Sequence, residues 1–354
     1  MSTYFDERNE KNIAAIDKLL RELPDFAWEF NVGISMRTTP LTRLGYLRDI
    51  RVFCDYLVKR RFGKKTVKDI SVSDLDRLTP TDVEAYIDYL SAYTLDGKKY
   101  SCKDYAKERK VSSLRALFKY FYKKEKLSSD IMSKVDSPKT HLKPIVRLDV
   151  DEVVEILDEA ENGENLTGRQ KAFHKKTSVR DEAMLSLFLG TGIRISECVG
   201  LNRDDVNFND NSFVVTRKGG DSAILYFSDE VANALKRYLD WLDGEIAEKT
   251  PFGLRVTDKD ALFVSSKGTR ITPRAVEMMV KKYASVTTPF KRITPHKLRS
   301  TYGTNLYRET HDIFVVADVL GHKDVNTTRK HYAAMSEDIR RDVVNKIKLR
   351  DDDE

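Results

Sequence analysis

The residues of this sequence that could carry out chemistry on a phosphate are Arg, Lys, His and Tyr side chains in the second half of the chain. His296 and Arg299 lie in ITPHKLRSTYGTNLY, where Thr294 can cap a helix and Pro295 can begin it. Both side chains then fall on one face, one turn apart, near the positive end of the helix. Free backbone N–H groups, a two-pronged guanidinium donor and an imidazole at such a place are typical of a phosphate site. The pair alone is a weak signal, because short motifs often occur by chance.

An arginine follows a glycine turn between two apolar segments. In LFLGTGIRISECVGL, a helix is interrupted at Gly190-Thr191-Gly192 and resumes after Arg194. A guanidinium in apolar surroundings is costly unless it is paired. Arg194 is therefore expected either to be held by Glu197, one turn further on, or to bind an anion. The sequence leaves both open.

Three further side chains stand beside glycines or small polar residues. Lys218 follows SFVVT and precedes Gly219-Gly220, so it is expected at a hairpin tip, where flexible backbone can approach a ligand. His322 comes directly after Gly321, which is expected to end a helix, and Tyr332 follows a run of small polar and basic residues. Each has an ordinary alternative: a solvated lysine, a histidine that bonds a helix end, and a half-buried tyrosine.

The elements that must position these residues are mostly helices. In the first 135 or so residues, apolar side chains recur every three or four positions. This pattern predicts helices at about 9–23, 38–60 and 107–123, and another from Thr79-Pro80 onward. We predict no strand there, and therefore a helical bundle over residues 1–135.

The rest of the chain is predicted to be mixed but mainly helical. Residues 136–147 hold two prolines and no apolar periodicity, which indicates an extended linker. Asp149 and Glu152 form a capping-box pattern, and the segments 212–216 and 223–227 flank a turn and predict a β-hairpin. Further helices are expected at about 229–244 and 311–320, and from Thr272-Pro273 and Thr294-Pro295. The fold class is therefore mainly α with a small β-sheet, with a second domain at 148–354.

Taken in order, Arg194, Lys218, His296, Arg299, His322 and Tyr332 resemble the signature of the tyrosine recombinase (phage integrase) family. The strings GTGIRISE, TPHKLRST and LGHKDVNTT are similar to the family's motifs, and TTPLTRLGYLRDIRVFCDYL resembles its helical DNA-clamping domain. LPDFAWEF and VVTRKGG look similar to Xer-type recombinases that act alone. Two positions depart from the pattern: Ser300 stands where a second histidine is common, and Tyr332 follows His322 by ten positions, one more than usual.

The resemblance implies a helical core-binding domain and a mostly helical catalytic domain that form a C-shaped clamp on DNA. It implies that Tyr332 attacks a phosphodiester, forms a 3′-phosphotyrosine and releases a 5′-hydroxyl that can rejoin another strand. Because one phosphodiester is exchanged for an ester of similar energy, we expect no ATP and no cofactor. The sequence has no P-loop and no tight carboxylate cluster for metal ions.

The resemblance also assigns roles around the attacking phenol. A phenol has a pKa near 10 and needs a base at neutral pH, for which His296 is the candidate. Arg194 and Arg299 would meet the charge on the phosphate oxygens, each contributing about 3 kcal/mol to the transition state. His322 would add a hydrogen bond, and Lys218 would protonate the departing 5′-oxygen.

Binding to the DNA backbone is expected from basic side chains on the outer faces of the first domain. The candidates are Arg43, Lys59, Arg60, Arg61, Lys64, Lys65, Arg109, Lys110, Arg115 and Lys119. Family precedent gives as partners a double-stranded recombination site and the neighbouring subunits of a cyclic tetramer. The amphipathic stripe at 339–347 would dock on a neighbour, with packing on its own domain as the open alternative. The need for an accessory protein stays open.

Composition excludes other classes. The chain has 354 residues, of which 33% are charged, a net charge of +6, and no apolar stretch long enough for a membrane span or a signal peptide. We therefore expect a cytoplasmic protein without a membrane partner. The cysteines at 54, 102 and 198 are unclustered, which argues against disulfides and a zinc site and favours small buried residues.

Several functions compete on this basis. The first is resolution of chromosome dimers by a Xer-like recombinase, and the close alternative is integration and excision of a mobile element. A type IB topoisomerase would share the catalytic set, but the first-domain strings favour a recombinase. A DNA-binding accessory protein that does not cleave is the alternative of another class.

Overall fold

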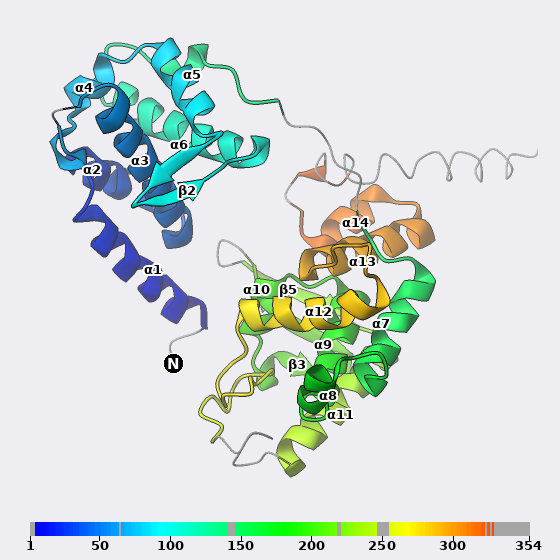
Figure 1. Ribbon diagram of the computed structural model, residues 1–354. Helices are drawn as coiled ribbons and strands as arrows, with labels where there is room; N and C mark the ends of the chain where they lie inside the picture. Colours follow the sequence, from blue (N-terminus) through cyan, green and yellow to red (C-terminus); the bar gives the residue numbers. More distant parts are fainter. Residues whose placement is uncertain are drawn as a thin grey trace, which may run out of the picture. The chain divides into compact units, whose positions relative to one another are not determined.

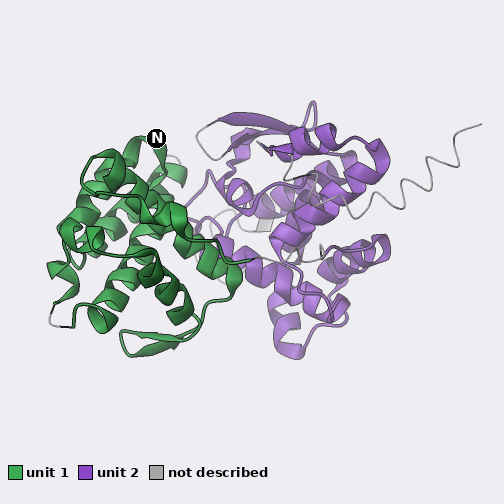
Figure 2. Cartoon of the chain, turned by 90° about the horizontal axis from the view of Figure 1, so that it is seen from above, with its two compact units in different colours: residues 1–143 green, residues 144–354 purple. Residues whose placement is uncertain are grey.

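A computed structural model describes residues 4–63, 65–139, 146–217, 221–245, 255–322, 324, 325 and 328. The chain divides into two compact units, residues 1–143 and 144–354 (Figure 2). The division falls within the segment predicted as a linker, of which residues 140–145 lie outside the described part. Each unit is described by itself.

Unit 1 is a bundle of helices with one short hairpin (Figure 1). Its core is formed by apolar side chains that the helical periodicity had selected, among them Leu47, Ile50 and Phe53 of one helix and Leu114 and Phe118 of another, all at most 1% exposed. Its elements are α1 (Tyr4–Leu20), α2 (Asp25–Gly33), α3 (Pro40–Arg60), α4 (Val72–Asp76), α5 (Pro80–Tyr89), β1 (Tyr93–Leu95), β2 (Lys98–Tyr100) and α6 (Asp104–Lys123), with 3-10 turns at Ser35–Arg37, Val67–Asp69 and Ile131–Lys134.

The helix-start signals in unit 1 act through their side chains. The Thr39 hydroxyl accepts from the backbone N–H of Thr42, and the Thr79 hydroxyl from that of Asp82, both at 3.3 Å. A proline follows each cap, where its missing N–H leaves no bond unmade.

The prediction of no strand in unit 1 is wrong. β1 and β2 pair antiparallel, with Leu95 opposite Lys98. The two residues between them, Asp96 and Gly97, have φ of 50° and 75°. Aspartate followed by glycine is the usual sequence of this tight hairpin turn, so the signal was present in YTLDGKKY.

Unit 2 is mainly helical with a three-stranded antiparallel sheet in the order β3-β4-β5. In the predicted hairpin, Phe213 lies opposite Leu225. The elements are α7 (Val150–Asn162), α8 (Gly168–His174), α9 (Ser178–Thr191), α10 (Ile195–Gly200), a 3-10 turn (Arg203–Asp205), β3 (Val206–Asn207), β4 (Ser212–Thr216), β5 (Ser222–Tyr226), α11 (Asp229–Glu245), α12 (Pro273–Thr287), α13 (Pro295–Thr310) and α14 (Ile313–Leu320).

The central helix of unit 2 is α9. Residues 183–188 are all buried, because α7, α11 and α13 pack against different sides of the helix (Figure 1). A helix that is apolar all round must be covered all round. The C-terminal end of α9 is thereby fixed next to α13, and Arg194 follows shortly after it in the chain.

A buried polar network anchors the other end of α9. Asp181, 0% exposed, accepts from Arg180, Lys282 and Tyr283, with Nζ of Lys282 at 2.8 Å and Oη of Tyr283 at 2.9 Å. Burial alone would raise the pKa of Asp181, but the charges of Arg180 and Lys282 hold it below its ordinary value. Nδ1 of His174 lies 3.0 Å from the Tyr283 hydroxyl. Burial and the Lys282 charge lower the pKa of this histidine.

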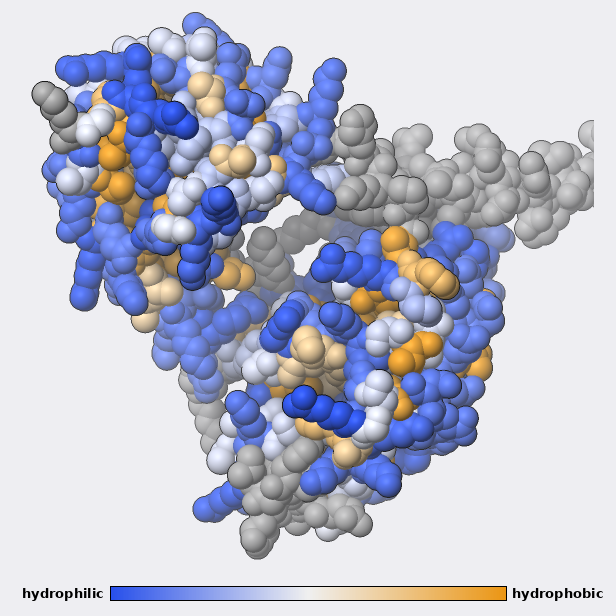
Figure 3. Space-filling view, in the orientation of Figure 1, coloured by the Kyte–Doolittle hydropathy of each residue, from blue (hydrophilic) through white to orange (hydrophobic). Residues whose placement is uncertain are grey.

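The visible face of each unit is mostly hydrophilic, with small apolar patches (Figure 3). Among the described residues, no helix is long and apolar enough to cross a membrane. The cysteines are free, with Cys54 and Cys198 buried and Cys102 partly exposed. Burial raises the pKa of the Cys54 and Cys198 thiols, which makes them poor nucleophiles.

Candidate active site

Arg194 stands at the junction of α9 and α10. Gly192 ends α9 with φ of 61°, and Arg194 is the residue before the first turn of α10. Its Nη1 donates to Oε1 of Glu197 at 2.7 Å, while its backbone N–H donates to Oε2 at 3.0 Å. Glu197 therefore holds both the backbone and the guanidinium of Arg194, which is one of the two outcomes expected from the sequence. The Arg194 side chain keeps 32% of its surface exposed.

The other arginine comes from the first turns of α13. Arg299 is 5% exposed; its Nη1 donates to the Gly192 carbonyl at 2.5 Å and its Nη2 to the Leu320 carbonyl. Pro295 begins the helix as predicted. His296 is exposed one turn before Arg299.

The two arginines meet at the C-terminal end of α14. Nη2 of Arg194 donates to the carbonyls of Leu320 at 3.1 Å and Gly321 at 2.8 Å, so the Leu320 carbonyl accepts from both guanidiniums. Unpaired carbonyls and the helix dipole make this end negative, which favours cations. His322 follows directly, and its Nδ1 lies 2.7 Å from Oγ1 of Thr328. The structure thus brings together Arg194, Arg299 and His322 from three distant segments.

Two of the predicted catalytic residues, Lys218 and Tyr332, lie outside the described residues, as does the C-terminal stripe at 339–347. The strand before Lys218 is described up to Arg217. Tyr302 packs with Leu320 and Val316. Burial raises the pKa of its phenol, so it is less suited than an exposed tyrosine to act as a nucleophile.

Sequence reasoning missed Arg217 and the part played by the α14 carbonyls. Gly321 has φ of 60°, and a Cβ there would overlap the guanidinium of Arg217. Gly192 is similar, because a Cβ would overlap the ring of Tyr302. Glycine is therefore required at both positions by backbone conformation and by close approach. The glycines were visible in the sequence, but the residues that approach them are distant in the chain.

One predicted DNA contact in unit 1 is corrected by the structure. Lys110 was expected on an outer face but is 6% exposed, and its Nζ donates to Oδ1 of Asp49 at 2.9 Å. Asp49, 1% exposed, also accepts two bonds from Arg109 and one from Ser113. Lys110 is therefore part of a buried ion cluster. Arg109 reaches the same carboxylate although 56% of its side chain is exposed.

The other candidates of unit 1 differ in exposure and in partners. Lys59, Arg60, Arg61 and Lys119 are exposed, whereas Arg43, Lys65 and Arg115 are partly buried, and Lys64 lies outside the described residues. Several of them have protein partners: Asp55 for Lys59, Asp82 for Arg61, Asp74 for Lys65, Asn31 for Arg43, and the Val135 carbonyl for Arg115. Charge on the outer surface is thus smaller than the sequence suggested.

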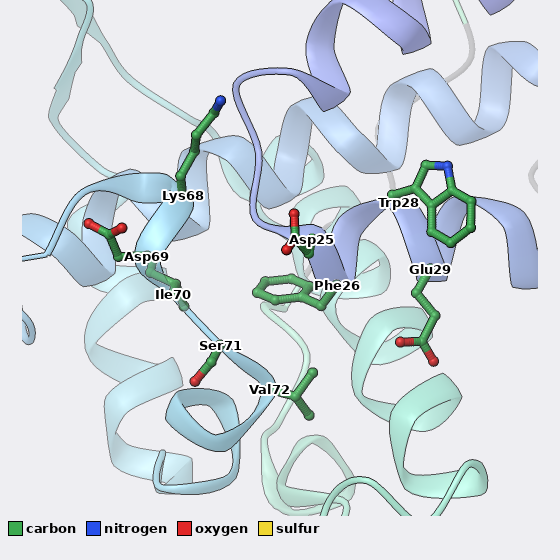
Figure 4. Close-up of a pocket in the computed structure, with 9 residues that line it drawn as sticks. All are labelled: Asp25, Phe26, Trp28, Glu29, Lys68, Asp69, Ile70, Ser71 and Val72. Carbon is green, nitrogen blue, oxygen red and sulfur yellow. The ribbon is translucent and has the colours of Figure 1, made fainter.

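A pocket of about 530 Å³ in unit 1 is separate from this chemistry (Figure 4). Trp28 and Glu29 of α2 line one side, and Lys68 and Asp69 line the other. None of the predicted site residues belongs to it. Within the described ranges, we also find no group of three or more His, Cys, Asp or Glu side chains that could hold a metal ion.

Comparison with known proteins adds to this geometry. The model of the phage integrase family matches residues 146–338. The chain is 28% identical over 320 residues to tyrosine recombinase XerC of Syntrophus aciditrophicus, which covers 90% of this chain and 93% of that protein. It is 31% identical over 349 residues to tyrosine recombinase XerS of Streptococcus agalactiae, covering 91% and 95%. The structure of XerH site-specific recombinase bound to a palindromic difH substrate in a post-cleavage complex has a similar fold, with a TM-score of 0.64 at 17% identity and coverage of 86% and 80%.

Proposed function

The chain belongs to the phage integrase family, and from this premise we propose that it exchanges DNA strands through a 3′-phosphotyrosine on Tyr332. Membership makes the protein a tyrosine recombinase, an enzyme that cleaves and rejoins DNA. The covalent intermediate and the biological task are the steps proposed.

The proposed reaction exchanges one ester for another. The Tyr332 oxygen attacks phosphorus as His296 takes its proton, and the bond from phosphorus to the 5′-oxygen breaks. Lys218 gives the departing 5′-oxygen a proton. A 5′-hydroxyl from a second strand then attacks the phosphotyrosine and restores the phenol. Charge on the phosphate oxygens is met by Arg194 and Arg299.

The observation that carries the proposal is the convergence of Arg194 and Arg299 at the end of α14. Both donate to the Leu320 carbonyl, two residues before His322. Fixed guanidiniums that need no rearrangement are the most effective stabilisers of a developing charge. The C-terminal end of α14 thus lies at the arginine pair, directly before His322.

DNA binding and assembly follow from the same proposal. Exposed basic residues such as Arg60 and Lys119 would contact phosphates, and the two units would clamp the duplex. The XerH neighbour was solved on DNA, which supports a recombination site as the substrate. A tetramer on two sites, with or without an accessory protein, is the proposed working assembly, and the cytoplasm is its proposed place.

For the biological task, we propose Xer-type resolution of chromosome dimers. The support is that similarity to XerC and XerS extends over about nine-tenths of this chain and of those proteins. Mapping where the purified protein protects and cuts genomic DNA tests this. A single chromosomal site near the replication terminus is expected, and cutting at the ends of a mobile element would favour integration instead.

The chemical step is tested with nicked target DNA recovered by that mapping. Because of the nick, the short fragment that carries the released 5′-hydroxyl diffuses away. A protease-sensitive covalent adduct between protein and DNA therefore accumulates. Tyr332→Phe should bind the DNA equally and form no adduct. An absence of adduct with the unaltered protein, or equal adduct with Tyr332→Phe, would contradict the proposed chemistry and favour a DNA-binding protein that does not cleave.

A further inference from the structure

Arg217 joins the β4–β5 hairpin to the end of α14. Its backbone N–H donates to the Asp221 carbonyl at 2.7 Å, which closes the turn after the last ladder pair, Thr216 opposite Ser222. Its Nη2 reaches the Val319 carbonyl at 3.5 Å. One residue therefore contacts two elements that are about a hundred positions apart in the sequence.

The guanidinium of Arg217 lies directly against Gly321. A Cβ at Gly321 would overlap Nη1, Cζ and Nε, so the planar group covers the position where any other residue would carry a side chain. In the same backbone segment, the Gly321 carbonyl accepts from Nη2 of Arg194 at 2.8 Å. The segment before His322 is thus held by one arginine through hydrogen bonds and by another through packing.

Hydrogen bonding alone does not explain this position of Arg217. The contact with Val319 is long, and Nε is buried without a hydrogen-bond partner among the described residues. A buried, unpaired donor destabilises a fold. Such a group in a native structure calls for an explanation. The close contact of the Arg217 guanidinium is its packing against Gly321.

We propose that Arg217 is a positioning residue for Lys218, the residue that follows it in the chain. The inference rests on the proposed function, in which Lys218 is the general acid. Because Lys218 is bonded directly to Arg217, the contacts of Arg217 with Asp221, Val319 and Gly321 limit where a general acid at position 218 can be placed. Displacement of a catalytic group by about 1 Å can slow a reaction by about 100-fold.

The test separates proton donation from general structural damage. A DNA substrate with sulfur in place of the scissile 5′-oxygen releases a thiolate, which leaves without a proton. The bond from phosphorus to sulfur breaks, sulfur takes the electron pair, and Tyr332 still forms the phosphotyrosine. A defect in placing Lys218 should therefore disappear on this substrate, whereas loss of the arginine pair or of the fold should not.

Cleavage rates are compared for the unaltered protein, Arg217→Ala and Arg217→Met on the oxygen and sulfur substrates. We expect both variants to lose about 100-fold on the oxygen substrate and to lie within about threefold of the unaltered protein on the sulfur substrate. Arg217→Met keeps a long side chain without the buried donor, so it guards against misfolding of the alanine variant. Lys218→Ala should show the same rescue. Arg237→Ala, which breaks an exposed ion pair with Glu182, should change neither rate.

The inference is overturned if the Arg217 variants cleave normally or lose the same factor on both substrates. Failure of the proposed function looks different, because the unaltered protein would then form no adduct on either substrate.

Discussion

Replacement of Asp49 by alanine should lower the free energy of unfolding of unit 1 far more than a typical surface substitution does. The carboxylate is 1% exposed and accepts bonds from Arg109, Lys110 and Ser113. Arg109 can turn toward water, since 56% of its side chain is already exposed. Lys110, at 6% exposure, cannot. Removing one partner of a buried ion pair costs about 3–5 kcal/mol, because the other charge is left uncompensated.

The same structure predicts that a second substitution restores stability. Lys110→Met in the Asp49→Ala protein removes the stranded charge and leaves a side chain of similar length. Exchanging a buried ion pair for apolar groups is often neutral. We therefore expect the double variant to be more stable than Asp49→Ala alone, although it carries one more change.

Urea unfolding of the full chain measures this cycle. The protein has two tryptophans, and Trp241→Phe leaves Trp28 as the reporter of unit 1. With an m-value of about 2 kcal/mol/M for a unit of this size, a loss of 4 kcal/mol moves the midpoint by about 2 M. If the effects of Asp49→Ala and Lys110→Met simply add, the two side chains do not interact and the reasoning is refuted.

DNA binding supplies an independent check of the same correction. Lys110→Met should leave the slope of log K against log salt unchanged, because a buried lysine neutralises no phosphate. Lys119→Met, an exposed position on the same helix α6, should lower the magnitude of the slope by about 0.9. A decrease of that size for Lys110→Met would mean that Lys110 reaches the DNA.

Three further outcomes are expected. Arg299→Lys should slow cleavage of nicked DNA by about 100-fold with little change in DNA affinity, because a lysine cannot donate from two nitrogens to the Gly192 and Leu320 carbonyls; a loss below about threefold would contradict this. Gly321→Ala should lower both cleavage and the free energy of unfolding, the latter by at least about 1 kcal/mol from the positive φ, and unchanged thermal unfolding would argue against the contact. The pKa of His174 is below its ordinary value in the folded protein, so the stability that the neutral histidine contributes is present above about pH 6.5 and declines as the pH falls below that value. The difference in unfolding free energy between the unaltered protein and His174→Phe should therefore become smaller from pH 7.5 to pH 5.5. A constant difference would refute the assignment.

Local signals predicted much of the fold. The predicted Thr-Pro pairs at 79–80 and 272–273 begin helices because the cap and the proline act within one turn of chain. Pro295 also begins a helix as predicted, although the Thr294 side chain makes no capping hydrogen bond. The capping box of Asp149 and Glu152 and the hairpin β4–β5 are local in the same sense. The hairpin at Asp96-Gly97 was equally local and was missed because its strands are only three residues long.

Contacts between distant segments set the limit of sequence reasoning. Lys110 looked like an outward-facing residue because periodicity describes one helix and cannot show that Asp49 lies buried opposite, 61 positions away. The chemistry of the arginines was predictable from type and order, but their common acceptor was not. A backbone carbonyl has no letter in the sequence, so nothing marked Leu320 as the point where Arg194 and Arg299 meet.

The charges at this point suit the proposed reaction. The described contacts at the end of α14 join the guanidiniums of Arg194, Arg217 and Arg299, and Glu197 pairs with Arg194. A phosphodiester enters with one negative charge and gains a second as the nucleophile adds. Carbonyl dipoles orient the guanidiniums without cancelling their formal positive charge. The end of α14 therefore orients the cations, whose positive charge favours the state with two negative charges over the bound ground state.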